Sequence, residues 1–65
     1  MELNVGKIKM LLNSLGWSMA DLGRALQPVV SRQAIWKVIH ERKASWNMLN
    51  RIGKALSVNA KDLII

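Results

Sequence analysis

Apolar residues recur every three to four positions along most of this chain, which is the spacing of helices that bury one face. The first such stretch covers residues 2–15. Asn4 can cap its first turn, and Gly16 marks its end, because glycine adopts a positive φ without steric cost. The pattern therefore predicts a first helix over residues 2–15, with Lys7 and Lys9 facing solvent.

A second, shorter stretch predicts a helix over residues 19–26. Ser18 precedes it, and Asp21 follows three positions later, which resembles a capping box with Asp in place of the usual Glu. Pro28 ends the stretch, because a residue that precedes proline avoids the α region. Gly23 is costly inside a helix, so we expect another helix to pass too close there for a side chain.

The third stretch begins after Ser31, whose hydroxyl can cap the free N–H groups of a helix that starts at Arg32. One side of this predicted helix is apolar and consists of Ala34, Ile35, Val38 and Ile39. The opposite side carries Gln33, Trp36, Lys37 and His40. Arg, Gln and Lys offer the donors and acceptors that read base edges in a DNA major groove, so this face is the first candidate site. An ordinary solvated face is the plain alternative.

Two more elements complete the pattern. A fourth helix is predicted from about Ser45, with a buried side made of Met48, Leu49, Ile52, Ala55 and Leu56. Residues 59–62 resemble a second capping box, which would open a short helix that ends in Leu63, Ile64 and Ile65. No linker, repeat or low-complexity segment interrupts the chain, so residues 1–65 are expected to form a single domain.

Composition and charge narrow the functions that so small a chain can perform. With 65 residues, 51% of them hydrophobic, it can bury a core but not a deep substrate cavity as well. The sequence has no cysteine for disulfides or thiolate metal sites, and no apolar run resembles a membrane span or a signal peptide. The net charge of +6 favours polyanionic partners, with nucleic acid first and an anionic membrane surface second.

The residue types give little support to catalysis or metal binding. His40 is the only histidine and has no cysteine partner, so a structural role or a phosphate contact is favoured over a metal site. The serines fit better as helix caps than as nucleophiles, and the sequence has neither paired carboxylates nor a glycine-rich phosphate loop. We therefore expect no enzyme activity, no cofactor, no metal and no small-molecule ligand.

Residues 18–39 resemble the helix-turn-helix of the phage repressor and Cro family, also called the XRE-like family. The resemblance is carried by Leu-Gly-Trp-Ser before the second helix, Asp-Leu-Gly-Arg-Ala-Leu within it and Val-Ser-Arg-Gln-Ala-Ile at the start of the third. Residues 54–64 are similar to the last helices of that family. The resemblance implies an all-α, compact five-helix, lambda-repressor-like DNA-binding domain. The turn over residues 27–30 is longer than the family's turn and lacks its usual glycine.

The resemblance also implies a function: a cytoplasmic, nucleoid-associated transcriptional regulator, encoded by a bacterium or a phage, that binds a palindromic operator in double-stranded DNA as a homodimer. A Cro-like repressor, a restriction-modification controller and an antitoxin all fit this description. The residues predicted to read bases are Arg32, Gln33 and Lys37, with Trp36 as a candidate fourth. Those predicted to contact the DNA backbone are Ser18, Ser31, His40, Arg42, Lys43 and Arg51.

Some assignments stay open at this point. Trp36 can contact a thymine methyl or the sugar-phosphate edge, or it can pack against the apolar loop over residues 28–30. A homodimer contact is predicted at Trp46, Met48, Leu63, Ile64 and Ile65, although at least one of the last three must face the core.

The function itself has two rivals. One is a protein-interaction module that keeps the same fold but no longer binds DNA. The other is a basic amphipathic chain at a membrane surface, which the internal helix caps argue against.

Overall fold

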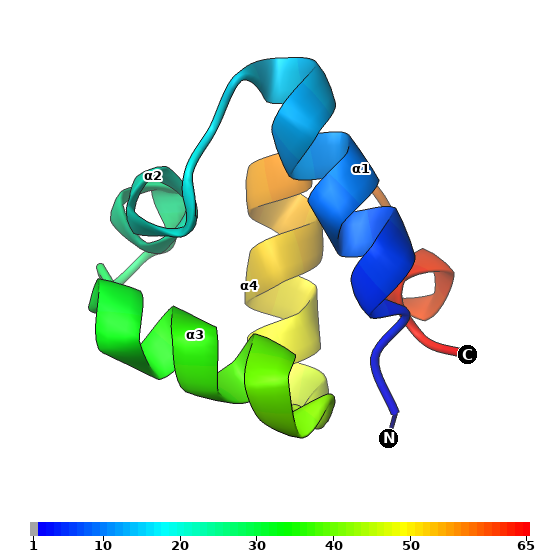
Figure 1. The fold of residues 1–65 in the computed structure, drawn as a ribbon. Coiled ribbons are helices and arrows are strands. Elements are labelled where there is room, and N and C mark those ends of the chain that lie inside the picture. The colour runs from blue at the N-terminus through cyan, green and yellow to red at the C-terminus, as the bar shows by residue number, and fades with distance from the viewer. Residues whose placement is uncertain (1) are drawn as a thin grey trace.

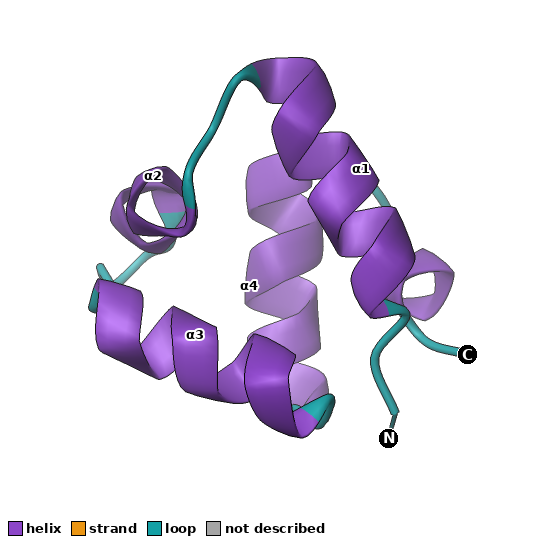
Figure 2. Ribbon diagram, in the orientation of Figure 1, coloured by secondary structure: helices purple, strands orange, loops and turns teal. Residues whose placement is uncertain are grey.

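The computed structural model describes residues 2–65. These residues form four α-helices and one 3-10 helix: α1 (Val5–Leu15), α2 (Met19–Ala25), α3 (Arg32–Glu41), α4 (Trp46–Leu56) and η1 (Ala60–Leu63). Helix α4 lies at the centre, with α1 and η1 on one side of it and α2 and α3 on the other (Figure 1). Loops alone join the helices, and no strand is drawn among the described residues (Figure 2). The predicted all-α class is confirmed, but the fifth element is one 3-10 turn.

All four α-helices begin where a capping side chain was predicted. The hydroxyls of Ser18, Ser31 and Ser45 each accept a hydrogen bond from the backbone N–H three residues later, at 3.1–3.2 Å. The Asn4 side chain does the same for Lys7 at 3.2 Å. These bonds satisfy N–H groups that have no partner within the helix, so each one fixes a helix start.

The segment before α1 is extended, which corrects the prediction that the first helix begins at residue 2. The N–H of Leu3 donates to the carbonyl of Arg42 at 2.9 Å, and the N–H of Asn4 donates to the carbonyl of Leu63 at 2.8 Å. Residues 2–4 therefore lie between the loop after α3 and the last residues of the chain. Bonds to these distant backbone groups replace the helical bonds that the local pattern suggested, and Leu3 becomes fully buried.

The second predicted capping box, over residues 59–62, is wrong. Asn59 makes no side-chain cap hydrogen bond, and its backbone carbonyl accepts the N–H of Asp62 at 3.0 Å instead. A single 3-10 turn closes on backbone bonds alone, so it has no need of the side-chain cap.

One apolar core fills the space between the helices. Its fully or almost fully buried members come from every element and from the N-terminal segment: Leu3, Ile8, Leu12, Leu22, Leu26, Ile35, Ile39, Leu49, Ile52, Leu56, Ala60 and Leu63. None of the α-helices in residues 2–65 is long and apolar enough to cross a membrane.

Two helical glycines let the backbone approach closely. A Cβ on Gly23 would lie 2.2 Å from the carbonyl oxygen of Val30, so the segment that passes close there is the loop before α3. The prediction that a neighbouring helix passes at that point is therefore corrected, although an Ile35 side-chain atom lies at an ordinary 3.5 Å. Gly53, which the sequence pattern did not single out, has the same role for the carbonyl oxygen of Val58, at 2.7 Å.

Candidate nucleic-acid interface

The loop between α2 and α3 is held from two sides, and this fixes how α3 is presented. On one side, the N–H of Val30 donates to the carbonyl of Gly23 in α2 at 3.0 Å. On the other, the guanidinium of Arg51 in α4 donates to the carbonyl of Pro28, which follows a cis peptide bond. The structure thus gives Arg51 a positioning role that the sequence did not suggest. Its predicted contact with a DNA phosphate stays a prediction.

Helix α3 is anchored by its apolar side and exposes the other. Ile35 and Ile39 are buried, and Ala34 and Val38 are half-buried. The exposed side chains are Arg32, Gln33, Trp36, Lys37 and His40. All four residues predicted to read bases are therefore accessible on one short helix whose backbone is held by its core contacts.

Trp36 forms a flat aromatic pair with His40, one helical turn further on. The two ring centroids are 4.6 Å apart, with an angle of 9° between the ring planes. The indole is 53% exposed, and Val29 in the neighbouring loop is 66% exposed. Packing of Trp36 against that loop, one of the two arrangements the sequence left open, is therefore not the arrangement found. An exposed aromatic face remains available to a partner.

The surface is hollowed on several sides of Trp36. A pocket of about 430 Å³ is shared with Arg32 and with the first residues of α2, including Ser18. A smaller one, of about 190 Å³, is shared with Arg32 and Gln33. Residues predicted to contact bases and backbone therefore border the same depressions.

The start of α2 carries a negative charge beside Ser18. The predicted capping box is confirmed: the Asp21 carboxylate accepts the Ser18 N–H at 2.8 Å and the Ser18 hydroxyl at 3.1 Å. The bond from the Ser18 N–H, followed by the bond from its hydroxyl, holds the pKa of Asp21 below its usual range, and the adjacent Arg24 adds to this. A phosphate at Ser18 would therefore lie next to a charged carboxylate that is partly balanced by Arg24.

The loop after α3 presents two cationic side chains from a fixed backbone. Arg42 has a φ of 59°, in the left-handed region that favours glycine, and its carbonyl accepts the Leu3 N–H. Lys43 pairs with Glu2 in an isolated backbone bridge. Both side chains are exposed. Because the backbone is tied to the N-terminal segment, Arg42 and Lys43 project from a fixed edge of α3.

Few of the charged side chains neutralise one another. Within residues 2–65 the only ion pair joins Arg24 to Asp21, so the Lys and Arg side chains on and after α3 have no carboxylate partner there. The same part of the chain contains no group of three His, Cys, Asp or Glu residues that could hold a metal ion. The exposed face of α3 is thus bordered by positive charge that the chain does not compensate.

The residues predicted to form a dimer contact have different fates in the structure. Trp46 and Ile65 are exposed, by 48% and 79%. Met48 and Ile64 are half-buried against the core, and Ile64 pairs with Leu3 in a backbone bridge. Leu63 is fully buried, so its predicted place in a dimer interface is wrong. A residue that packs entirely within its own core has no surface left for a second copy.

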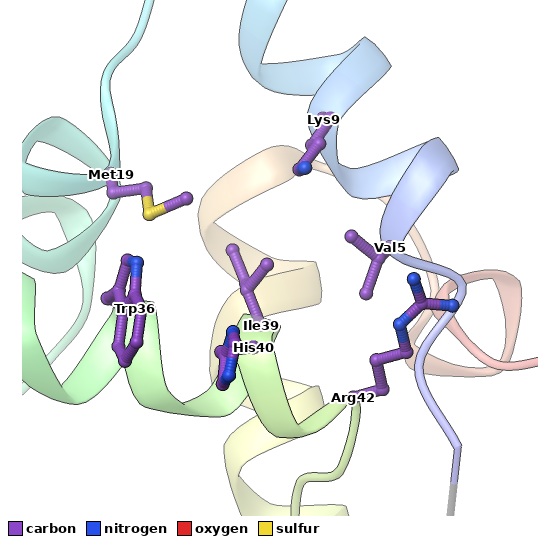
Figure 3. A pocket seen from close by; sticks show the side chains of 7 residues that line it. All are labelled: Val5, Lys9, Met19, Trp36, Ile39, His40 and Arg42. Atoms are coloured by element: carbon purple, nitrogen blue, oxygen red, sulfur yellow. The ribbon is translucent and has the colours of Figure 1, made fainter.

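One cationic residue near α3 was missed. Lys9, expected only to face solvent, lines a pocket together with His40 and Arg42 (Figure 3). Nothing in the sequence pattern could have shown this, because only the fold brings α1 next to the end of α3. The Trp36–His40 pair, in contrast, lies at the four-residue spacing of neighbours on one helix face, so the sequence contained that signal.

No protein-family model, curated protein or solved structure matches this chain. What the structure defines is a small all-α domain of four α-helices and a 3-10 turn, with a cationic, aromatic helix face at its surface. The resemblance to the phage repressor and Cro family stays a prediction from the residues that carry it.

Proposed function

We propose that this protein is a sequence-specific, double-stranded DNA-binding regulator of the helix-turn-helix type, which acts as a homodimer on a palindromic operator. The observation that carries the proposal is the outward face of α3. It combines exposed Arg32, Gln33 and Lys37 with a backbone held in place by buried Ile35 and Ile39. A rigid helix with such side chains fits the width of a major groove.

Each exposed residue has a role in this proposal. Arg32 and Lys37 donate to the acceptors of guanine, and the Gln33 amide pairs with the donor and acceptor of adenine. Arg42 and Lys43 contact phosphates on the edge of the groove, where they fix the register but read no sequence. Occupied DNA then blocks or recruits the transcription machinery at a promoter. A homodimer requires half-sites about one DNA turn, or roughly 34 Å, apart.

Selection of bound sequences from a random pool of duplexes tests the proposal. We expect enrichment of a two-fold symmetric site, and steep weakening of binding to that site as salt is raised. Six to eight phosphate contacts per dimer correspond to a slope of about −5 to −7 in log K against log salt. A flat salt response, or a pool that stays random, would contradict DNA binding.

A protein-interaction module of the same fold is the second candidate. Two observations favour it: the large exposed indole of Trp36, and the charged Asp21 carboxylate at the start of α2, where a phosphate would otherwise be welcome. In that case duplex DNA would show no saturable binding at any salt concentration, and Trp36→Ala would abolish capture of a protein partner.

A further inference from the structure

A pocket opens between α1, the start of α2 and the end of α3, next to the proposed reading face. Its volume is about 170 Å³. Lys9 reaches toward it from α1 and Arg42 from the residue that caps α3, while the stacked rings of His40 and Trp36 line it along α3 (Figure 3). Groups with hydrogen-bond donors thus meet at one cavity from separate elements.

The lining of this pocket is cationic without an internal counter-charge. Of its lining residues, all within residues 2–65, none is an aspartate or glutamate. Neither Lys9 nor Arg42 forms an ion pair with any carboxylate in that part of the chain. Two cationic side chains beside one cavity repel each other unless an anion lies between them. The pocket is therefore complementary to a negatively charged group.

The backbone at Arg42 is a second, independent observation. Its φ of 59° is disfavoured for any residue with a Cβ, and glycine is the usual residue at this position after a helix. The chain nevertheless carries a long guanidinium side chain there, and that side chain lines the pocket. The energetic cost of the conformation is understandable if the guanidinium has a ligand.

We propose that this pocket binds a phosphate group. Lys9 and Arg42 are its charged donors, the His40 ring supplies a further N–H, and the Trp36–His40 stack forms a wall for the sugar or base attached to the phosphate. The phosphate belongs either to the DNA backbone or to a free nucleotide. In the first case the inference rests on the proposed function and extends the DNA contact to α1; in the second it stands alone.

The variants follow from the geometry. Lys9→Ala removes one exposed donor, and Arg42→Gly removes the other while it favours the left-handed backbone, so both should fold. Lys61→Ala removes the same charge from an exposed site outside the pocket and is the matched control. Lys9→Arg keeps the charge and should keep binding, which separates loss of a ligand from loss of structure.

Two measurements distinguish the sources of the phosphate. In the first, inorganic phosphate and adenosine monophosphate are titrated at constant ionic strength while the ring resonances of Trp36 and His40 are followed by NMR. A free ligand gives saturable shifts that weaken roughly tenfold in Lys9→Ala and in Arg42→Gly. In the second, a DNA phosphate lowers the salt slope of duplex binding by about one in each of these variants and leaves it unchanged in Lys61→Ala.

The results separate this inference from the proposed function. Saturable phosphate binding without any duplex binding would support the pocket and contradict the DNA-binding proposal. Duplex binding with an unchanged salt slope in Lys9→Ala and Arg42→Gly, together with linear phosphate titrations, would overturn the pocket and leave the DNA-binding proposal intact. Equal losses in the Lys61→Ala control would also overturn it, because the effect would then be one of net charge alone.

Discussion

The carbonyl oxygen of Val30 occupies the position next to Gly23 that a side chain would need: a Cβ there would lie 2.2 Å away. The N–H of the same valine donates to the Gly23 carbonyl at 3.0 Å. This double contact ties the loop before α3 to α2, so the orientation of α3 depends on the absence of one methyl group.

Gly23→Ala should therefore destabilise the fold by about 1–3 kcal/mol, a large part of the stability of so small a domain, because the loop backbone must move. Gly6→Ala is the matched control, since its Cβ would meet only an Asn4 side-chain atom at 3.7 Å. That variant should gain about 0.5–1 kcal/mol from helix propensity. Urea unfolding measures both. Equal midpoints for Gly23→Ala and the parent would refute the close contact.

Arg51→Ala should cost about 1 kcal/mol, because it removes the bond from α4 to the Pro28 carbonyl. The loss is kept moderate because the buried Nε of Arg51 has no hydrogen-bond partner within residues 2–65, and its desolvation is relieved in the variant. Lys54→Ala, an exposed neighbour on α4, is the control. Thermal unfolding gives the stability, and the salt slope of duplex binding shows whether Arg51 also contacts a phosphate. A stable variant with a reduced slope would assign Arg51 to DNA alone.

Base reading and phosphate contact should separate in a comparison of Gln33→Ala with Lys43→Ala. Both side chains are exposed, so neither change should alter the fold. Gln33→Ala should cost about 1–3 kcal/mol on the selected site and relax the preference at particular base pairs. Lys43→Ala should weaken all duplexes alike and lower the salt slope by about one. Uniform loss in Gln33→Ala would show that α3 does not read the groove.

The dimer proposal is best tested at Ile65, whose side chain is 79% exposed although its N–H bonds the Glu2 carbonyl at 3.1 Å. Ile65→Lys should favour the monomer without disturbing that bond, and binding to a full operator should weaken more than binding to a half-site. Met10→Lys, at 59% exposure on α1, is the control. Sedimentation velocity reports the oligomeric state. Identical profiles for Ile65→Lys and the parent would exclude this residue from the interface.

Acid should weaken the start of α2. The pKa of Asp21 is lower in the folded chain than its usual value of 3.8, so the carboxylate contributes stability above that pH. This contribution declines as the pH falls through 3.8 and is gone below the lowered pKa of the folded state. The melting temperature of the parent should therefore fall in this range more than that of Asp21→Asn. Parallel curves for the two proteins would show that the capping charge is not linked to stability.

Local features were predictable from the sequence, and distant pairings were not. The caps at Ser18, Ser31 and Ser45 depend on residues three positions away, so the pattern was enough to place them. The bond between Asn4 and Leu63 joins opposite ends of the chain, and no periodicity encodes it. The same bond explains why the first helix was predicted to start too early.

The candidate site divides in the same way. The exposed face of α3 follows from helical spacing around Ile35 and Ile39, so its members were predicted correctly as surface residues. The pocket shared by Lys9 and Arg42 depends on how α1 packs beside α3, which the sequence does not reveal. The structural bond of Arg51 was hidden for the same reason, because it reaches across to a loop 23 residues earlier.

The extended residues 2–4 have a consequence for how the molecule comes into being. Leu3 finds its backbone partner at Arg42, and Asn4 finds its partner at Leu63. A ribosome that synthesises this chain therefore releases α1 long before the groups that secure its first turn exist. The helices cannot be locked in one after another during translation, and the domain assembles in a single step once residue 63 has left the exit tunnel.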